Sequence, residues 1–187
     1  MTKARDLASG GFGLVLIKPS TVVNGTDNGK GTVSFSAQSS VSLNDVFSST
    51  YENYKVVIAL SSSTGTYARV RLRVSGSDAS GSNYDWGFAM TTNLGSAFQL
   101  AASSASAWNV TRPSSGNESM STFEITNPFL TKQTILSGTT SYNDGATVGI
   151  AGSIGGRHTL TTSYTGVSVV ADSGTITGTV SIYGFNK

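Results

Sequence analysis

Apolar and polar side chains alternate with a period of two along much of this chain, and this pattern constrains the fold more than any other feature. Three stretches show it best: Asn53–Leu60, Thr66–Val74 and Ile176–Tyr183. A period of two places successive side chains on opposite faces of an extended strand. Asn53–Leu60 is apolar on both faces, which predicts a strand in the middle of a sheet.

Further short segments rich in β-branched and aromatic residues extend the pattern, and turn-forming pairs such as Ser173-Gly174 and Gly155-Gly156 separate them. The expected strands are Thr32–Ala37, Val41–Phe47, Tyr84–Met90, Ala107–Arg112, Met120–Asn127, Gln133–Tyr142, Thr147–Ala151, His158–Tyr164 and Gly166–Ala171. No long segment carries the apolar stripe of an amphipathic helix. The sequence therefore predicts an all-β fold, an antiparallel β-sandwich of jelly-roll type with about eight to ten strands.

The first 30 residues have a different composition. Two cations are followed by a glycine-rich stretch, four apolar residues and a polar stretch. We expect residues 1–30 to form an extended arm outside a sandwich domain that spans 31–187. The arm is either a flexible terminus or a docking segment that orders on a partner. The docking residues would be Lys3, Arg5, Leu14, Val15, Leu16 and Ile17.

The chain is poor in charge, which argues against several classes of partner. Only 12% of its 187 residues are charged and the net charge is +2, whereas 31 Ser, 24 Thr and 22 Gly supply the polarity. No concentrated basic patch is present, so we expect no nucleic-acid partner. No apolar run approaches a membrane span of about 20 residues or a signal-peptide core, so we expect neither membrane insertion nor export. Cysteine is absent, which excludes disulfides and thiolate chemistry.

Catalytic motifs are weak. His158 is the only histidine, and we interpret it as a polar residue of a strand or rim. A two-carboxylate hydrolase would need Glu118 or Glu124 to meet an aspartate in a cleft. Turn aspartates such as Asp78 and Asp172 lack the spacing of a calcium loop. We therefore expect no enzyme activity, no cofactor and no metal.

Three arginines, Arg69, Arg71 and Arg73, share one face of a predicted strand. Guanidinium groups in one row repel each other unless water, acids or anions lie opposite. Two interpretations stay open. The row is either a solvated face, or it contacts another subunit or an acidic polymer.

Aromatic residues gather on the strand that follows. Tyr84, Trp86 and Phe88 share one face, with Asp85 on the other. Aromatic rings combine apolar area with a polar tip, so they can stack on sugars as well as fill a core or a subunit interface. Tyr84 and Trp86 are the candidate glycan contacts.

Several segments resemble proteins of tailed bacteriophage particles. The segment Val46–Ile58 is similar to a stretch common in such virion proteins, as are Ala68–Ser77 with the following Asn83–Asp85, and the ending Gly174–Lys187. The opening Thr2–Ala8 resembles the start of fibre-like proteins of marine phages, including cyanophages. These segments occur in the same order over residues 2–8 and most of 46–187.

The resemblance implies a small, multimeric β-sandwich protein of the phage particle, without catalytic residues. We expect a virion-surface appendage, such as a short tail fibre or receptor-binding tip, that contacts host glycan. Its partners would be other virion proteins and two further copies of itself in a trimer. A capsid decoration or head fibre is the alternative, and a free carbohydrate-binding module is a second.

Overall fold

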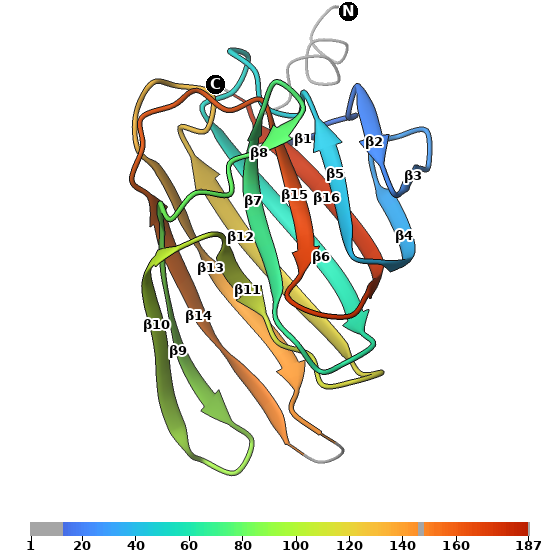
Figure 1. Ribbon diagram of the computed structural model, residues 1–187, viewed down its shortest axis with the longest axis vertical. Helices are drawn as coiled ribbons and strands as arrows, with labels where there is room; N and C mark the ends of the chain where they lie inside the picture. Colours follow the sequence, from blue (N-terminus) through green and yellow to red (C-terminus); the bar gives the residue numbers. More distant parts are fainter. Residues whose placement is uncertain (1–12, 146–147, 187) are drawn as a thin grey trace, which may run out of the picture.

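The computed structural model describes residues 13–145 and 148–186, and this part of the chain folds into two antiparallel β-sheets packed face to face (Figure 1). The larger sheet runs in the order β10-β9-β14-β13-β12-β6-β16-β4-β3, and β1 pairs with β16 beside β4. The smaller sheet runs β11-β7-β15-β5-β2, with β8 beside β7. The predicted jelly-roll-like β-sandwich is confirmed.

The strands of the larger sheet are β1 (Leu14–Leu16), β3 (Thr26–Asp27), β4 (Val33–Gln38), β6 (Asn53–Ser62), β9 (Tyr84–Thr92), β10 (Ala97–Ala105), β12 (Glu118–Thr126), β13 (Thr134–Asn143), β14 (Gly149–His158) and β16 (Ile176–Phe185). Those of the smaller sheet are β2 (Thr21–Val23), β5 (Ser40–Asn44), β7 (Ala68–Val74), β8 (Ser77–Asp78), β11 (Trp108–Thr111) and β15 (Gly166–Ala171). The chain crosses repeatedly from one sheet to the other, as in a jelly roll.

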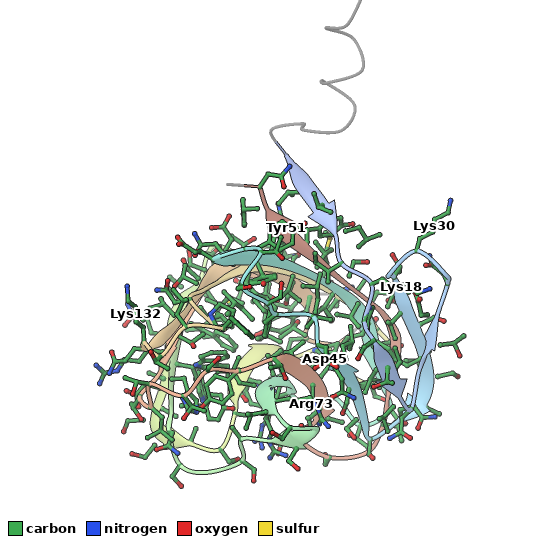
Figure 2. All side chains as sticks on the ribbon, turned by 90° about the horizontal axis from the view of Figure 1, so that it is seen from above. Lys18, Lys30, Asp45, Tyr51, Arg73 and Lys132 are labelled. Atoms are coloured by element: carbon green, nitrogen blue, oxygen red, sulfur yellow. The ribbon has the colours of Figure 1, made fainter. Side chains whose placement is uncertain are left out.

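The core lies between the inner faces of the two sheets, where side chains from both layers meet (Figure 2). The period-two pattern explains why. In β6 the residues Tyr54, Val56, Ile58 and Leu60 are buried, and β6 lies between β12 and β16 as its two apolar faces predict. On β7 the apolar residues point into the core and the arginines point away, so Arg73 lies on the smaller-sheet side of the molecule in Figure 2.

The arm boundary predicted at residue 30 is wrong for the described residues. Leu14–Leu16 pairs with β16, Thr21–Val23 pairs with β5, and Thr26–Asp27 pairs with β4. Short strands at sheet edges carry too little periodicity to be recognised in a sequence, and here partner strands supply their hydrogen bonds. Residues 1–12, with Lys3 and Arg5, lie outside the described residues.

The region around His158 also differs from the expectation. The sequence predicts a turn at Gly155-Gly156 and a strand at His158–Tyr164, whereas β14 runs through both glycines and ends at His158. A Cβ on Gly156 would lie 2.8 Å from Cδ1 of Trp108, so this glycine makes room for an aromatic ring rather than for a turn. Within the described residues, no helix is long and apolar enough to span a membrane.

Candidate binding site

A pocket of about 290 Å³ lies where the chain leaves β10 and crosses to β11. It lies at the edge of the sandwich, between β10, which ends the larger sheet, and β11, which ends the smaller sheet. Its lining residues are Arg69, Trp86, Ala102, Ala105, Ser106, Ala107 and Asn109. It combines an aromatic ring, a guanidinium group and an amide with small side chains that leave space between them.

Trp86 forms the aromatic wall of this pocket. It follows buried Tyr84 by two residues on β9, so the strand alternation directs its ring toward the interior of the sandwich. The ring is only half-buried, and its centroid lies 5.3 Å from that of Phe88 and 6.2 Å from that of Tyr67. These neighbours fix the ring while part of it stays accessible.

Arg69 and Asn109 form the polar side of the pocket, and they lie opposite each other on β7 and β11. Nε of Arg69 donates to Oδ1 of Asn109 at 3.1 Å, and its terminal nitrogen lies 2.7 Å from a carboxylate oxygen of Asp172. Because Asp172 balances the guanidinium charge, this side of the pocket carries no net positive charge. Asn109 is largely buried, and its carbonyl oxygen is already bonded to Arg69, so the guanidinium is the more accessible polar group.

The structure brings together Trp86 and Arg69, which the sequence placed in two separate candidate sets. Sequence reasoning did not single out Asn109 and Asp172 as members of this site. Their roles depend on the pairing of β11 and β7 and on the path of the chain after β15, which a single sequence does not specify. The one available signal for Asn109 was that it is a polar residue between two apolar ones in the predicted strand Ala107–Arg112.

Tyr84 is wrong as a glycan contact, because its side chain is fully buried in the core. Its ring packs edge to face with Trp108, at a centroid distance of 5.1 Å. Its hydroxyl donates to the carbonyl of Ala79 at 2.7 Å and accepts from the N–H of Leu72 at 3.0 Å. Burial raises the pKa of this phenol. The hydroxyl thus has both a donor and an acceptor partner inside the fold.

The arginine row has acidic partners within the chain. Arg71 lies 3.9 Å from Asp78, and Arg73 contacts the same carboxylate more closely. Arg73 is nearly buried, and it also donates to Oδ1 of Asn44 at 3.1 Å and to Oγ of Ser168 at 2.9 Å. Mutual repulsion is thus relieved without a second subunit. Arg71 and Arg73 lie on the outer face of the smaller sheet. Of the three arginines, only Arg69 lines the pocket.

His158 lies in the core, not at a rim. It is fully buried, and the Tyr164 hydroxyl lies 3.2 Å from its Nδ1 atom. Glu118 and Glu124 are exposed on β12, where Glu124 stands opposite Lys55 on β6. Among the described residues, no three His, Cys, Asp or Glu side chains come together as a metal site.

The outer face of the larger sheet has a different character. A depression of about 420 Å³ there is lined by small and hydroxyl side chains of β12, β13 and β14, together with Met120. It contains neither an aromatic ring nor a charged group. The pocket beside Trp86 is smaller. Of the two, only this pocket is lined by both an aromatic ring and polar side chains.

No known protein family matches the sequence, and no curated protein matches it. Solved structures with a related arrangement include galectin LEC-6 of Caenorhabditis elegans, at 10% identity and a TM-score of 0.35, covering 79% of this chain and 91% of the galectin. The SPRY domain of human HERC1 has 9% identity and a TM-score of 0.30, covering 84% and 98%. A glycosyl hydrolase family protein from Mycobacterium fortuitum has 8% identity and a TM-score of 0.28, covering 89% and 94%. These weak likenesses concern the fold alone.

Proposed function

We propose that this chain is a non-enzymatic, saccharide-binding protein of a bacteriophage particle surface. The observation that supports the binding role is the convergence of Trp86, Arg69 and Asn109 on one pocket. The assignment to a phage particle rests on the sequence resemblance described above. The two parts of the proposal are independent and are tested separately.

The chemistry of the pocket suits an uncharged sugar. The face of an indole ring packs against the C–H groups of a pyranose, and guanidinium and amide groups bond to its hydroxyls. Asp172 already neutralises Arg69, so an anionic sugar would gain little from this cation. The volume of about 290 Å³ lies at the lower end of ligand pockets and fits one terminal sugar unit better than a long chain.

On the particle, the sandwich would face outward as a short tail fibre or receptor-binding tip, and the N-terminal residues would contact other virion proteins. A trimer follows from the resemblance to phage fibres. A capsid decoration or head fibre remains the alternative placement, and a free carbohydrate-binding module is the alternative outside phages. Immunogold labelling of intact particles separates them: label on the tail supports the appendage, label on the head the decoration, and unlabelled particles contradict both.

Tryptophan fluorescence tests the saccharide site directly. The chain has two tryptophans, and Trp108 is fully buried whereas Trp86 is partly accessible in the pocket. Titration with neutral mono- and disaccharides should change the emission of the wild-type protein. Trp86→Phe should abolish this signal, and Trp86→Ala should weaken binding measured by calorimetry about tenfold or more.

Two controls make the test specific. Tyr51→Ala removes an aromatic ring that packs on Tyr54, away from the pocket residues, and should leave the saccharide affinity unchanged. Asp172→Asn should shift the preference toward anionic sugars, since it frees the charge of Arg69. A saccharide that binds the Trp86→Ala variant as tightly as the wild type would contradict the proposed site.

A further inference from the structure

The strand β10 forms a free edge of the larger sheet. It pairs with β9 on one side only, and in Figure 1 nothing lies beside its other edge. Of the strands that end a sheet in the described residues, β10 has nine residues, whereas β11 has four, β2 three and β3 two. β10 is therefore the longest row of unpaired backbone groups at a sheet end.

The hairpin register identifies which groups are unpaired. The N–H of Thr92 donates to the carbonyl of Ser96 at 2.8 Å, which makes these two residues a hydrogen-bonded pair at the start of the hairpin. Hydrogen-bonded and non-hydrogen-bonded pairs alternate along an antiparallel ladder. The N–H and C=O groups of Ala97, Gln99 and Ala101 therefore point away from β9, toward the open edge.

This edge lacks the usual protection against pairing. Native proteins protect exposed edge strands against pairing by means of lysine, proline, inward-pointing charges or β-bulges. No charged residue occurs between Asp85 and Arg112, and β10 contains no proline. A bulge does occur, but it lies at the far end, where the register shifts after Ala102 and Ser104 adopts a φ of 54°. The segment from Ala97 to Ala102 is left as an uncharged and regular edge.

We propose that β10 pairs antiparallel with β10 of a second copy of this chain, about a two-fold axis at Gln99. Gln99 then faces Gln99 of the second copy, and Ala97 faces Ala101, so that all the outward backbone groups pair in register. Phe98 faces Leu100 of the second copy on the inner side, where both side chains are only half-buried in one chain. The two larger sheets join into one continuous sheet.

Three features of the β10 edge favour pairing with the same edge of a second copy. A two-fold axis requires a self-complementary strand, and this segment is uncharged throughout. The outward side chains on one face are alanine, glutamine and alanine, which pair without steric conflict. On the other face the pairing covers Phe98 and Leu100, which the single chain leaves partly exposed.

Cysteine cross-linking tests both the interface and its register, because the natural chain contains no cysteine. Gln99→Cys should form a disulfide-linked dimer under mild oxidation, since residues on the axis face each other. Ala97→Cys alone and Ala101→Cys alone should not cross-link, whereas an equimolar mixture of the two should. Ser153→Cys, exposed on β14 two strands away from the edge, is the control and should stay monomeric on non-reducing gels.

The oligomeric state in solution gives an independent readout. Sedimentation of the wild-type protein should show an even-numbered assembly, either a dimer or a hexamer made of two trimers. Gln99→Lys, which places two like charges on the axis, should raise the dissociation constant of this two-fold contact about tenfold or more. Thr139→Lys adds the same charge on exposed β13 and should leave this contact unchanged. A wild-type monomer, a multimer insensitive to Gln99→Lys, or self-cross-linking of Ala97→Cys would each overturn the proposal. A hexamer that contains the Gln99→Cys cross-link would support it, as two trimers joined by this two-fold contact.

Discussion

His158 is the most unusual residue of the core, since an imidazole sits in a cluster of aromatic rings. Its ring lies edge to face with Tyr84, at a centroid distance of 4.5 Å, and with Tyr164, at 5.1 Å. Burial lowers the pKa of His158 below its usual value near 6.5, with a smaller opposing effect from a backbone hydrogen bond to Leu160. The histidine is thus neutral in the folded protein and protonates readily only when the chain unfolds.

This difference predicts how stability depends on pH. Below about pH 6.5 the unfolded chain binds one proton more than the folded chain, so the free energy of unfolding should decrease as pH falls from 6.5 toward the lowered pKa of the folded state. The slope should reach at most about 1.4 kcal/mol per pH unit. Above pH 6.5 the contribution of His158 should be constant.

Urea unfolding at several pH values measures this slope. His158→Gln stays neutral in both states, so it should remove the slope between pH 5 and 6.5, even if its overall stability is lower. As His158 is the only histidine, few other side chains titrate in this window. The paired Asp85, whose pKa is lowered by the hydrogen bond from Arg157, acts at lower pH. A slope that persists in the variant would contradict the assignment.

At the scale of elements, the packing of β14 depends on Gly156, where β9 and the Trp108 ring both come close to the backbone. The Cβ of an alanine at position 156 would lie 2.6 Å from the carbonyl oxygen of Asp85 and 2.8 Å from Trp108. The Trp108 indole in turn donates to the carbonyl of Arg157 at 3.1 Å, which holds the ring over the glycine. We expect Gly156→Ala to destabilise the protein by about 1–3 kcal/mol through overpacking.

The neighbouring glycine is the matched control. At Gly155 the nearest atom to an added Cβ is the Leu136 carbonyl oxygen at 3.8 Å, which is an ordinary contact. Gly155→Ala should be neutral, or stabilising by up to about 1 kcal/mol, because it reduces the freedom of the unfolded chain. Thermal and chemical unfolding of both variants checks this. Equal effects of the two substitutions would show that Trp108 does not depend on Gly156.

The same two glycines show how far the sequence determines the fold. The alternation of apolar and polar residues was sufficient to predict the class of fold and the position of β6, because a strand that buries one face needs apolar residues at every second position. It was insufficient at Gly155-Gly156, since a glycine that admits a ring and a glycine that makes a turn look alike in a sequence. β10 was also missed, since its run of alanine and serine after Leu100 lacks the β-branched residues by which strands are recognised.

The candidate site was predictable only in part, for a related reason. Trp86 and Arg69 could be proposed from residue type, and Tyr84 could be proposed equally well. Only the packing separates them: Tyr84 is fully buried against Trp108, whereas Trp86 is half-buried and lines the pocket. Residue type limits the possible chemistry, and the packing of the two sheets decides which ring remains accessible.

At the scale of the whole molecule, the N-terminal segment is part of the sandwich from Leu14 onward. Leu14–Leu16 completes the edge of β16 beside β4, and the N–H of Ile17 donates to the carbonyl of Ile182 at 2.8 Å. Ile17 also packs against the core. The segment from residue 14 onward thus contributes to stability, and the preceding residues carry the proposed docking cations Lys3 and Arg5.

Two truncations separate these roles. Deletion of residues 1–12 leaves every described contact of the sandwich in place, so we expect the shortened chain to fold. Deletion of residues 1–20 removes β1 and the buried surface of Ile17, at a cost of about 2–4 kcal/mol, and should lower the melting temperature by about 5 °C or more. Calorimetry measures both. If the shorter truncation keeps the fold and yet fails to join phage particles in a complementation assay, the docking role belongs to residues 1–12. Incorporation of that truncation at the wild-type level would instead contradict a docking role for Lys3 and Arg5.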